Sequence, residues 1–333
     1  MTKKHRRRRS WSRTLLLLVF AVAAIYAGAH CLFRAPELGS SAEIAARAQA
    51  EALPEGTADA EAAAAAAALA AHTERKANFY TILVSGVDDG NGGSDTNILV
   101  AVDVDGGRIH GVSIPRDTKA VINGKNHKIN YAYNHGGTRL VADTISQQLG
   151  IPVDFTVTVD LSGFIDLVNA IGGVDFYVPI DMDYDDPLQD LSIHYQKGMQ
   201  HLNGQQAMEV VRFRQNNDGT GYGSQDIGRM STQQEFLKAV AKQTLTLSNM
   251  DKVGTFAKIF QNSVETDLTL GNLAWLGNAA ISMGVDNISF STLPSEWRSP
   301  YIYLDKDAVL TLVNESLNPY VEDRVMEDLD IPS

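Results

Sequence analysis

The 333-residue chain lacks the signatures of several common enzyme classes. It has no Walker A sequence, no G-x-S-x-G elbow and no H-E-x-x-H motif, so nothing in it supports P-loop nucleotide chemistry, an α/β-hydrolase or a zincin. Its single cysteine excludes an intramolecular disulfide framework and a cysteine-rich zinc site. The histidines show no metal-ligand spacing, so we interpret them as structural or surface residues.

Basic residues are scarce outside the N-terminus. Residues 1–13 hold seven Lys or Arg and no acid, which leaves 21 basic against 40 acidic residues in the rest of the chain. Duplex DNA binding needs a basic footprint that releases counterions from the phosphates. The acidic remainder therefore argues against a nucleic-acid partner.

One long apolar run is present, over residues 15–33, with His30 as its only plainly polar residue. At 1.5 Å rise per residue, about 19 residues span roughly 28 Å, close to the hydrocarbon core of a bilayer. The basic block over residues 1–14 predicts a cytoplasmic N-terminus, with the rest of the chain outside a bacterial cell membrane. A cleaved signal peptide is the alternative, but such apolar regions are usually shorter. Cys31 invites a lipoprotein interpretation, which His30 directly before it does not favour.

Residues 34–76 are dominated by alanine and include the run 62–68. Alanine is the best helix former, and Pro54 interrupts the pattern, so two short helices are plausible. There is no apolar stripe to bury. We interpret the segment as a stalk that holds a domain off the membrane; a flexible tether would have the same meaning.

Residues 77–318 have the texture of a globular domain. Short apolar runs alternate with helical spacing, which predicts a layered α-β-α domain of the α/β class. The turn Asp105-Gly106-Gly107 joins two strands as a hairpin, so the central sheet should be mixed. The tail over 319–333 is acidic and is expected to be frayed. The expected strands are 79–84, 98–104, 108–114, 155–159, 174–178 and 288–292, and the expected helices are 138–149, 162–171, a helix capped by Asn203 and ending near 213, one from about 229, 273–283 and 307–317.

Polar residues gather where predicted strands end or begin, which is where open α/β sheets bind ligands. Carboxylates on adjacent loops suit Mg²⁺, which commonly takes one or two of them and completes its shell with water and phosphate oxygens. Arginine is a planar bidentate donor that matches phosphate oxygens. Together the two kinds of residue suggest a pyrophosphate ligand. The carboxylates are Asp88, Asp89 and Asp95, and the arginines are Arg116, Arg212, Arg214 and Arg229; Lys128 and Gln233 are further polar residues of these segments.

Each of these residues also has a plain structural interpretation. Asp88 and Asp89 could be ordinary turn residues, and Asp95 could cap a turn. Arg212 and Arg214 could face solvent from a helix end. Arg229 could pair with Asp226 within one helical turn.

Taken in order, the polar positions resemble the LytR–CpsA–Psr (LCP) family of bacterial cell-envelope proteins, over roughly residues 78–295. The departures are the second acid Asp89, Gly93 in a place where many relatives have arginine, and the polar stretch 216–224. The matching runs are Gly86-Val87-Asp88, Ser94-Asp95-Thr96, residues 112–117 (VSIPRD), residues 128–133 (KINYAY) with Gly136-Gly137, Gly172-Gly173-Val174, Asn203-Gly204, Arg212-Phe213-Arg214 and residues 226–229 (DIGR) leading to Gln233-Gln234, with Leu268-Thr269-Leu270 and Thr292-Leu293-Pro294 near the end.

The resemblance implies a phosphotransferase that moves a glycopolymer, such as teichoic acid or capsule, from an undecaprenyl-pyrophosphate carrier lipid onto peptidoglycan. The predicted partners are this lipid-linked glycopolymer, a peptidoglycan acceptor and the membrane. It further implies that Asp88 and Asp95 hold Mg²⁺, and that Asp88, Asp95 and Arg116 act in catalysis. The pyrophosphate would be held by Arg116, Lys128, Arg212, Arg214, Arg229 and Gln233.

Three alternatives stay open. The same site with attacking water would make a polyprenyl-pyrophosphate hydrolase. A non-catalytic envelope regulator is the reading behind the old label "transcriptional attenuator", although residues 1–14 are too short to fold and read DNA bases. A non-catalytic envelope-binding module is the third, and it would not need the carboxylates.

Overall fold

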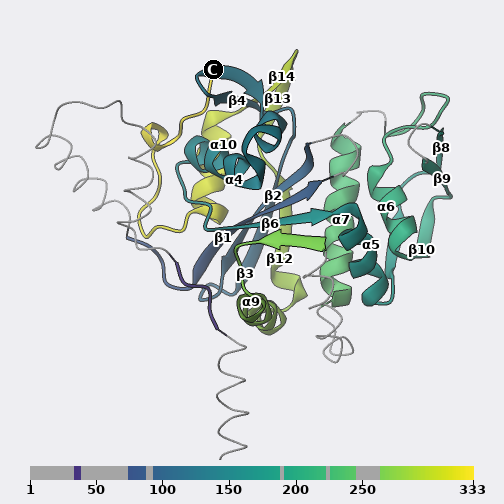
Figure 1. Ribbon diagram of the computed structural model, residues 1–333, viewed down its shortest axis with the longest axis horizontal. Helices are drawn as coiled ribbons and strands as arrows, with labels where there is room; N and C mark the ends of the chain where they lie inside the picture. Colours follow the sequence, from purple (N-terminus) through teal and green to yellow (C-terminus); the bar gives the residue numbers. More distant parts are fainter. Residues whose placement is uncertain (1–33, 39–73, 88–92, 188–190, 223–225, 245–262) are drawn as a thin grey trace, which may run out of the picture.

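A six-stranded mixed sheet forms the centre of the computed structural model, which describes residues 34–38, 74–87, 93–187, 191–222, 226–244 and 263–333 (Figure 1). The strand order is β11-β6-β1-β2-β3-β12. β1 pairs antiparallel with β2 and parallel with β6, and β12 pairs parallel with β3. The predicted mixed sheet is therefore confirmed. The strands are β11 (Val264–Thr266), β6 (Phe155–Asp160), β1 (Phe79–Val87), β2 (Ser94–Asp103), β3 (Arg108–Ile114) and β12 (Ile288–Thr292).

Both faces of the sheet are covered, as the alternation of side chains along β1 requires. Phe79 and Leu83 point to one face, where they pack against α4 (Asn130–Leu149) and α10 (Lys306–Leu312). Tyr80 and Ile82 point to the other face, toward α9 (Leu270–Met283). This is the layered α/β arrangement that the sequence predicts.

Helix α4 begins earlier than predicted and is kinked. Gly136 and Gly137 have non-helical backbone angles inside it, and Gly137 has φ +65°. The predicted helix begins at residue 138, directly after these two glycines. In the structure they instead interrupt a helix that starts at Asn130. Gly150 ends the helix in the left-handed conformation, which glycine adopts without strain.

A second apolar cluster lies beside the sheet and is built by α5 (Leu161–Ala170), α6 (Gly204–Arg212) and α7 (Asp226–Thr244). Asn203 caps α6 in a capping box with Gln206, which confirms the predicted start of that helix. Helix α7 lies between this cluster and the edge strand β12. Its Phe236 is part of the cluster, and its Gln234 Nε2 donates to Thr292 Oγ1 of β12 over 2.8 Å. This position brings the start of α7 to the end of the sheet at which β3 finishes.

Four two-stranded sheets were not predicted as such, because their strands are short and carry mostly polar or half-exposed residues. Only Val174–Val178 among them was expected as a strand. The pairs are β4 (Lys119–Ile122) with β5 (Lys125–Lys128), β7 (Val174–Val178) with β10 (Gly198–Leu202), β8 (Met182–Asp186) with β9 (Leu191–Tyr195), and β13 (Ser295–Arg298) with β14 (Tyr301–Leu304).

The C-terminal segment over 319–333 packs on the domain, so the expectation of a frayed tail is wrong. Tyr320, Leu329 and Ile331 are buried in the core cluster that includes α4. Gln147 Nε2 donates to Asp330 Oδ2 over 2.7 Å. The apolar residues are spaced among acidic ones, so the segment buries one side while its charges stay at the surface.

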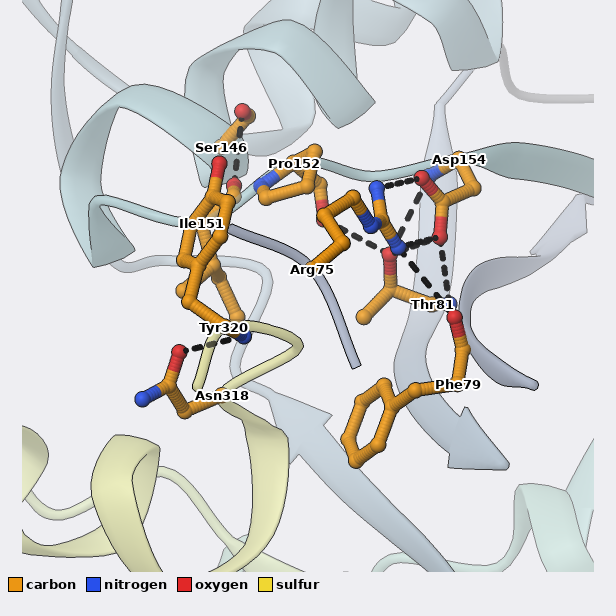
Figure 2. A network of polar contacts seen from close by, with 9 residues as sticks. All are labelled: Arg75, Phe79, Thr81, Ser146, Ile151, Pro152, Asp154, Asn318 and Tyr320. Atoms are coloured by element: carbon orange, nitrogen blue, oxygen red, sulfur yellow. Dashed lines mark hydrogen bonds and ion pairs between the residues drawn. The ribbon is translucent and has the colours of Figure 1, made fainter. Parts of the chain in front are cut away.

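Arg75 fastens the chain in front of β1 to the same side of the domain (Figure 2). Its Nη1 and Nη2 donate to the two carboxylate oxygens of Asp154 over 2.6 and 2.8 Å. Asp154 also accepts from the backbone N–H and the hydroxyl of Thr81, both over 2.9 Å. Arg75 further forms a β-bridge with Tyr320. The end of the predicted stalk segment is thus tied into the folded domain.

Within the described ranges, no helix is long and apolar enough to cross a bilayer. The predicted span over 15–33 lies outside the described residues, as do residues 39–73 of the predicted stalk.

Candidate anion-binding site

A pocket opens at the end of the sheet where β3 finishes and β2 begins. The first half of α7 forms its opposite wall, and β14 contributes one residue. Its position at strand ends agrees with the place predicted from the sequence. The lining residues are Thr96, Asn97, Ser113, Ile114, Pro115, Arg116, Asp117, Arg229, Gln233 and Ile302.

The loop after β3 is held rigidly by hydrogen bonds. The N–H and the hydroxyl of Thr118 both donate to the carbonyl of Pro115, over 3.0 and 2.7 Å. The carbonyl of Arg116 accepts from the N–H of Asn130 over 3.2 Å, and that of Asp117 accepts from Ile302 over 2.9 Å. Pro115 fixes its own φ as well. Little backbone entropy is therefore left to lose when a ligand contacts this loop.

Asp117 joins the two basic side chains of this region. Its Oδ2 lies 3.1 Å from Lys128 Nζ, and its Oδ1 lies 3.8 Å from Arg116 Nε. Lys128 reaches Asp117 because the hairpin β4–β5 returns the chain to the loop after β3. The Arg116 side chain is 34% exposed, so its guanidinium remains accessible from the pocket.

Arg229 and Gln233 enter the pocket from α7. Four residues apart on a helix, they lie on the same face. Gln233 Nε2 donates to the carbonyl of Val211 over 3.0 Å, which ties α7 to the end of α6. Both side chains are half-buried. The helix thus faces Arg229 toward the loop that carries Arg116.

A buried polar network lies under the pocket floor. Ser85 on β1 donates to Asn97 Oδ1 over 2.8 Å, and Asn97 Nδ2 donates to Ser94 Oγ over 3.0 Å. All three residues are buried. Because the network is satisfied internally, it fixes the start of β2, the strand that carries Asp95, against β1.

Arg212 and Arg214 lie at the end of α6 and are not among the pocket-lining residues. Arg212 is half-buried, and its Nη1 lies 3.9 Å from Met208 Sδ. Arg214 is exposed and lies near Tyr184 of β8. Burial raises the pKa of the Tyr184 phenol, and the positive charge of Arg214 partly opposes that rise. Phe213 between the two arginines is buried.

The predicted carboxylates cannot be placed in the pocket by their side chains. Asp88 and Asp89 lie outside the described residues, and Asp95 is described only as a backbone position of β2. Among described residues, no three histidine, cysteine, aspartate or glutamate side chains are grouped to hold a metal. The metal site over Asp88 and Asp95 stays a prediction.

His194 is a titratable residue that lies away from the pocket, on the exposed side of β9. Its Nδ1 lies 2.7 Å from Asp183 Oδ1 and its Nε2 lies 3.3 Å from Asp185 Oδ1. The hydrogen bond to Asp183 is the main cause that raises the pKa of His194. These contacts join the two strands of a surface hairpin, in line with the structural interpretation of the histidines.

Two pocket residues, Asn97 and Ile302, were not predicted from the sequence. Asn97 carried a weak signal, since it is a polar residue at the start of an otherwise apolar strand. Ile302 carried none, because it comes from a hairpin nearly 190 residues further on. Its N–H bond to the carbonyl of Asp117 is what brings it to the pocket.

Chemically, the described pocket offers two guanidinium groups, from Arg116 and Arg229, and two side-chain amides, from Asn97 and Gln233, against the carboxylate of Asp117. The ammonium group of Lys128 pairs with that carboxylate. Such a set favours an anion with several oxygens. The fold and the pocket together define an α/β protein with a candidate anion-binding site at the strand ends. The sequence profile of the LytR_cpsA_psr family matches residues 46–318, and the chain belongs to that family.

Two curated relatives come from Bacillus. The chain is 34% identical over 207 residues to the polyisoprenyl-teichoic acid–peptidoglycan teichoic acid transferase TagV of Bacillus subtilis, a match that covers 59% of this chain and 52% of the relative. It is 35% identical over 199 residues to the corresponding TagU of Bacillus cereus, with 58% and 62% covered. The matches thus span between half and two thirds of the length of these relatives.

Solved structures share the fold. The crystal structure of B. subtilis TagV aligns with a TM-score of 0.61 at 28% identity, over 78% of this chain and all of that chain. A LytR-Csp2A-Psr enzyme from Actinomyces oris aligns with a TM-score of 0.62 at 21% identity, over 74% and 93%. The second likeness concerns the fold alone.

Proposed function

We propose that the protein is a phosphotransferase that moves a glycopolymer from a polyprenyl-pyrophosphate carrier onto peptidoglycan. The observation that carries the proposal is the pocket that brings Arg116 and Arg229 together at the strand ends. Its support from the comparisons is that relatives at 34–35% identity are named polyisoprenyl-teichoic acid–peptidoglycan teichoic acid transferases.

In the proposed reaction the two guanidinium groups bind the pyrophosphate and hold it in one orientation. A hydroxyl of peptidoglycan attacks the phosphorus that carries the sugar. A new oxygen–phosphorus bond forms, the bond from this phosphorus to the bridging oxygen breaks, and polyprenyl phosphate leaves. Arg116 and Arg229 stabilise the charge that develops on the leaving phosphate. A carboxylate, Asp88 or Asp95, accepts the proton of the hydroxyl.

The same two carboxylates would hold Mg²⁺. The donor set suits this ion, because hard carboxylate oxygens beside a pyrophosphate are what Mg²⁺ prefers, with water in the remaining positions. When bound, the ion supplies positive charge at the phosphate oxygens. The satisfied network of Ser85, Asn97 and Ser94 supports the fit, since it holds the strand of Asp95 beside the end of β1.

We place the domain outside the cell membrane, anchored by the apolar run over 15–33 with residues 1–14 in the cytoplasm. A reporter enzyme that works only outside the cytoplasm should be active when it is fused after residue 76. Activity of a cytoplasm-dependent reporter at the same position would contradict this topology.

The function is tested by incubating the purified full chain with a polyprenyl-pyrophosphate-linked glycopolymer and peptidoglycan. We expect polyprenyl phosphate to be released together with glycopolymer bound to peptidoglycan. Release of the phosphate with free glycopolymer only would identify a hydrolase. Binding of the lipid without release would identify a non-catalytic module.

The metal is tested by Asp95→Ala. We expect this variant to need more Mg²⁺ for turnover, because one ligand of the ion is lost while the fold remains. The measurement is activity against Mg²⁺ concentration, with the melting temperature recorded on the same sample. An unchanged Mg²⁺ dependence in Asp88→Ala, Asp95→Ala and the double variant would remove the metal role of both residues.

A further inference from the structure

Helix α9 has an unusual surface for a helix at the outside of a domain. Over its 14 residues, Leu270–Met283, it carries no charged side chain. Only Ala279 among them is buried, and Leu270 is 37% exposed. Outer helices normally present charged residues to water on the face away from the core. In helix α9 the exposed residues are Leu270, Asn278 and Ser282, and the others apart from Ala279 are half-buried.

The described chain begins beside this helix. Asn272 Nδ2 on α9 donates to the carbonyl of Arg34 over 2.9 Å. Pro36 is buried, and Leu38 packs against the apolar cluster that contains Leu273 and Trp275. Residues 34–38 are thus docked on the α9 side of the sheet (Figure 1).

Residue 34 directly follows the predicted membrane span over 15–33. Consecutive Cα atoms are only about 3.8 Å apart, so a span that ends at residue 33 leaves the membrane at α9. The described residues on either side of 39–73 both belong to the domain, because residues 34–38 are docked on it and Arg75 is bonded to Asp154. That segment does not separate the span from the domain.

We propose that α9 and residues 34–38 form a membrane-contacting face, on which the domain rests directly against the outer surface of the lipid bilayer. The inference depends on the membrane anchor in the proposed topology, and on the described contacts for the face itself. An uncharged helix loses little on meeting the interfacial region of lipids, and it gains by covering the exposed side chain of Leu270.

A further feature fits a bilayer better than a soluble partner. Arg34 and Glu37, which form an exposed ion pair, sit where the span would emerge, at the level of the lipid headgroups. A soluble partner would have to compete with a bilayer that the span already holds beside α9.

The proposal has a consequence for the anion-binding pocket. The face lies at the end of the sheet where β1 begins, since Leu38 packs with Tyr80, whereas the pocket lies where β3 ends, close to the end of β1. β1 has nine residues, which at about 3.3 Å per residue place the two ends roughly 30 Å apart. A carrier lipid must cover that distance between the bilayer and Arg116.

The test uses spin labels on the full chain in lipid vesicles. In a Cys31→Ser background, Leu270→Cys places a nitroxide on α9. Val121→Cys is the matched control, because Val121 is an apolar residue with 47% exposure on β4, at the far end of the molecule from α9 in Figure 1. Both positions are surface positions, so neither label should disturb the fold. Electron paramagnetic resonance then compares collisions of each label with oxygen, which concentrates in lipid, and with a water-soluble nickel complex.

We expect the ratio of oxygen to nickel collisions to be clearly higher at position 270 than at position 121. Equal, water-like ratios at both positions in protein that floats with the vesicles would overturn the membrane-contacting face while leaving the anchor intact. A label at 270 that is shielded from both agents would indicate a protein contact and also overturn it. Failure of the protein to float would remove the anchor and the face together. The transfer assay on the same labelled samples reports on the proposed function independently.

Discussion

Two arginines in this protein differ in how closely a neighbouring carboxylate holds them. Arg75 is 8% exposed and makes two hydrogen bonds to Asp154, which is 3% exposed. Arg116 is 34% exposed, and its Nε lies 3.8 Å from Oδ1 of Asp117. The other carboxylate oxygen of Asp117 pairs with Lys128. The first pair is short, bidentate and closed to water (Figure 2); the second is long and open to a pocket.

The difference follows from the chain around each residue. Arg75 lies between the C-terminal segment and the start of β1, where backbone from two distant parts of the sequence surrounds it. Arg116 lies on a loop whose carbonyls at 115, 116 and 117 all accept hydrogen bonds, so its side chain projects from a fixed base. A fixed backbone with an accessible guanidinium is suited to bind an anion, whereas a buried pair stabilises the fold.

The largest expected effect is on the buried pair. Asp154→Ala leaves the Arg75 guanidinium buried without its counter-charge, and it also removes the acceptor of two bonds from Thr81. Breaking a buried pair in this way costs about 3–5 kcal/mol in the free energy of unfolding. Chemical denaturation of the variant measures this loss. A loss below 1 kcal/mol would show that the pair contributes to stability no more than a surface ion pair does.

The next largest effect is on ligand affinity. Arg116→Lys keeps the charge but loses the bidentate fork. Charge-assisted hydrogen bonds are worth roughly 1.5–3 kcal/mol each, so affinity for polyprenyl pyrophosphate should fall by about ten- to a hundredfold. The melting temperature should stay unchanged.

Arg108→Lys is the matched control for Arg116→Lys. Arg108 begins the strand that leads to Arg116, is exposed, and pairs with Asp103 at the far end of the sheet from the pocket. We expect its affinity to equal that of the unaltered protein. If Arg116→Lys lowers the melting temperature and retains full affinity, Arg116 belongs with Arg75 as a structural residue.

The smallest effect is expected at Arg214. This side chain is exposed beside Tyr184 and does not line the pocket, so Arg214→Ala should change the affinity for the carrier by no more than about twofold, within the range of exposed charges. Titration of both variants with the same lipid makes the comparison. A loss as large as that of Arg116→Lys would return Arg214 to the pyrophosphate-binding set predicted from the sequence.

The sequence predicted the mixed sheet and the place of the pocket because both depend on local signals. Apolar runs bounded by glycine mark β1 and β3, and the Asp105-Gly106-Gly107 turn joins β2 to β3 as a hairpin. Polar residues that follow such strands collect at one edge of the sheet, which is why Arg116 was found among the candidates. Arg229 and Gln233 were candidates only by residue type, and the family resemblance gave them a place at the site, since nothing local shows that α7 returns to β3.

The features that were missed depend on contacts between distant parts of the chain. Arg75 gave no sign that it pairs with Asp154, 79 residues further on. Acidic residues dominate the C-terminal segment, so its three buried apolar side chains gave too weak a pattern to predict a packed end. The short hairpins are held by pairing and by neighbours such as Asp117, which bonds Ile302, and not by strong strand propensity.

Native mass spectrometry of the full chain, released from membranes in mild detergent, is the most direct test of the account. The central claim is that the pocket of Arg116 and Arg229 binds the phosphate groups of a polyprenyl carrier. We predict a copurifying species with the mass of a polyprenyl phosphate or pyrophosphate, retained in Arg108→Lys and depleted in Arg116→Lys. Equal retention of that lipid in both variants, or its absence from the unaltered protein, would contradict the claim.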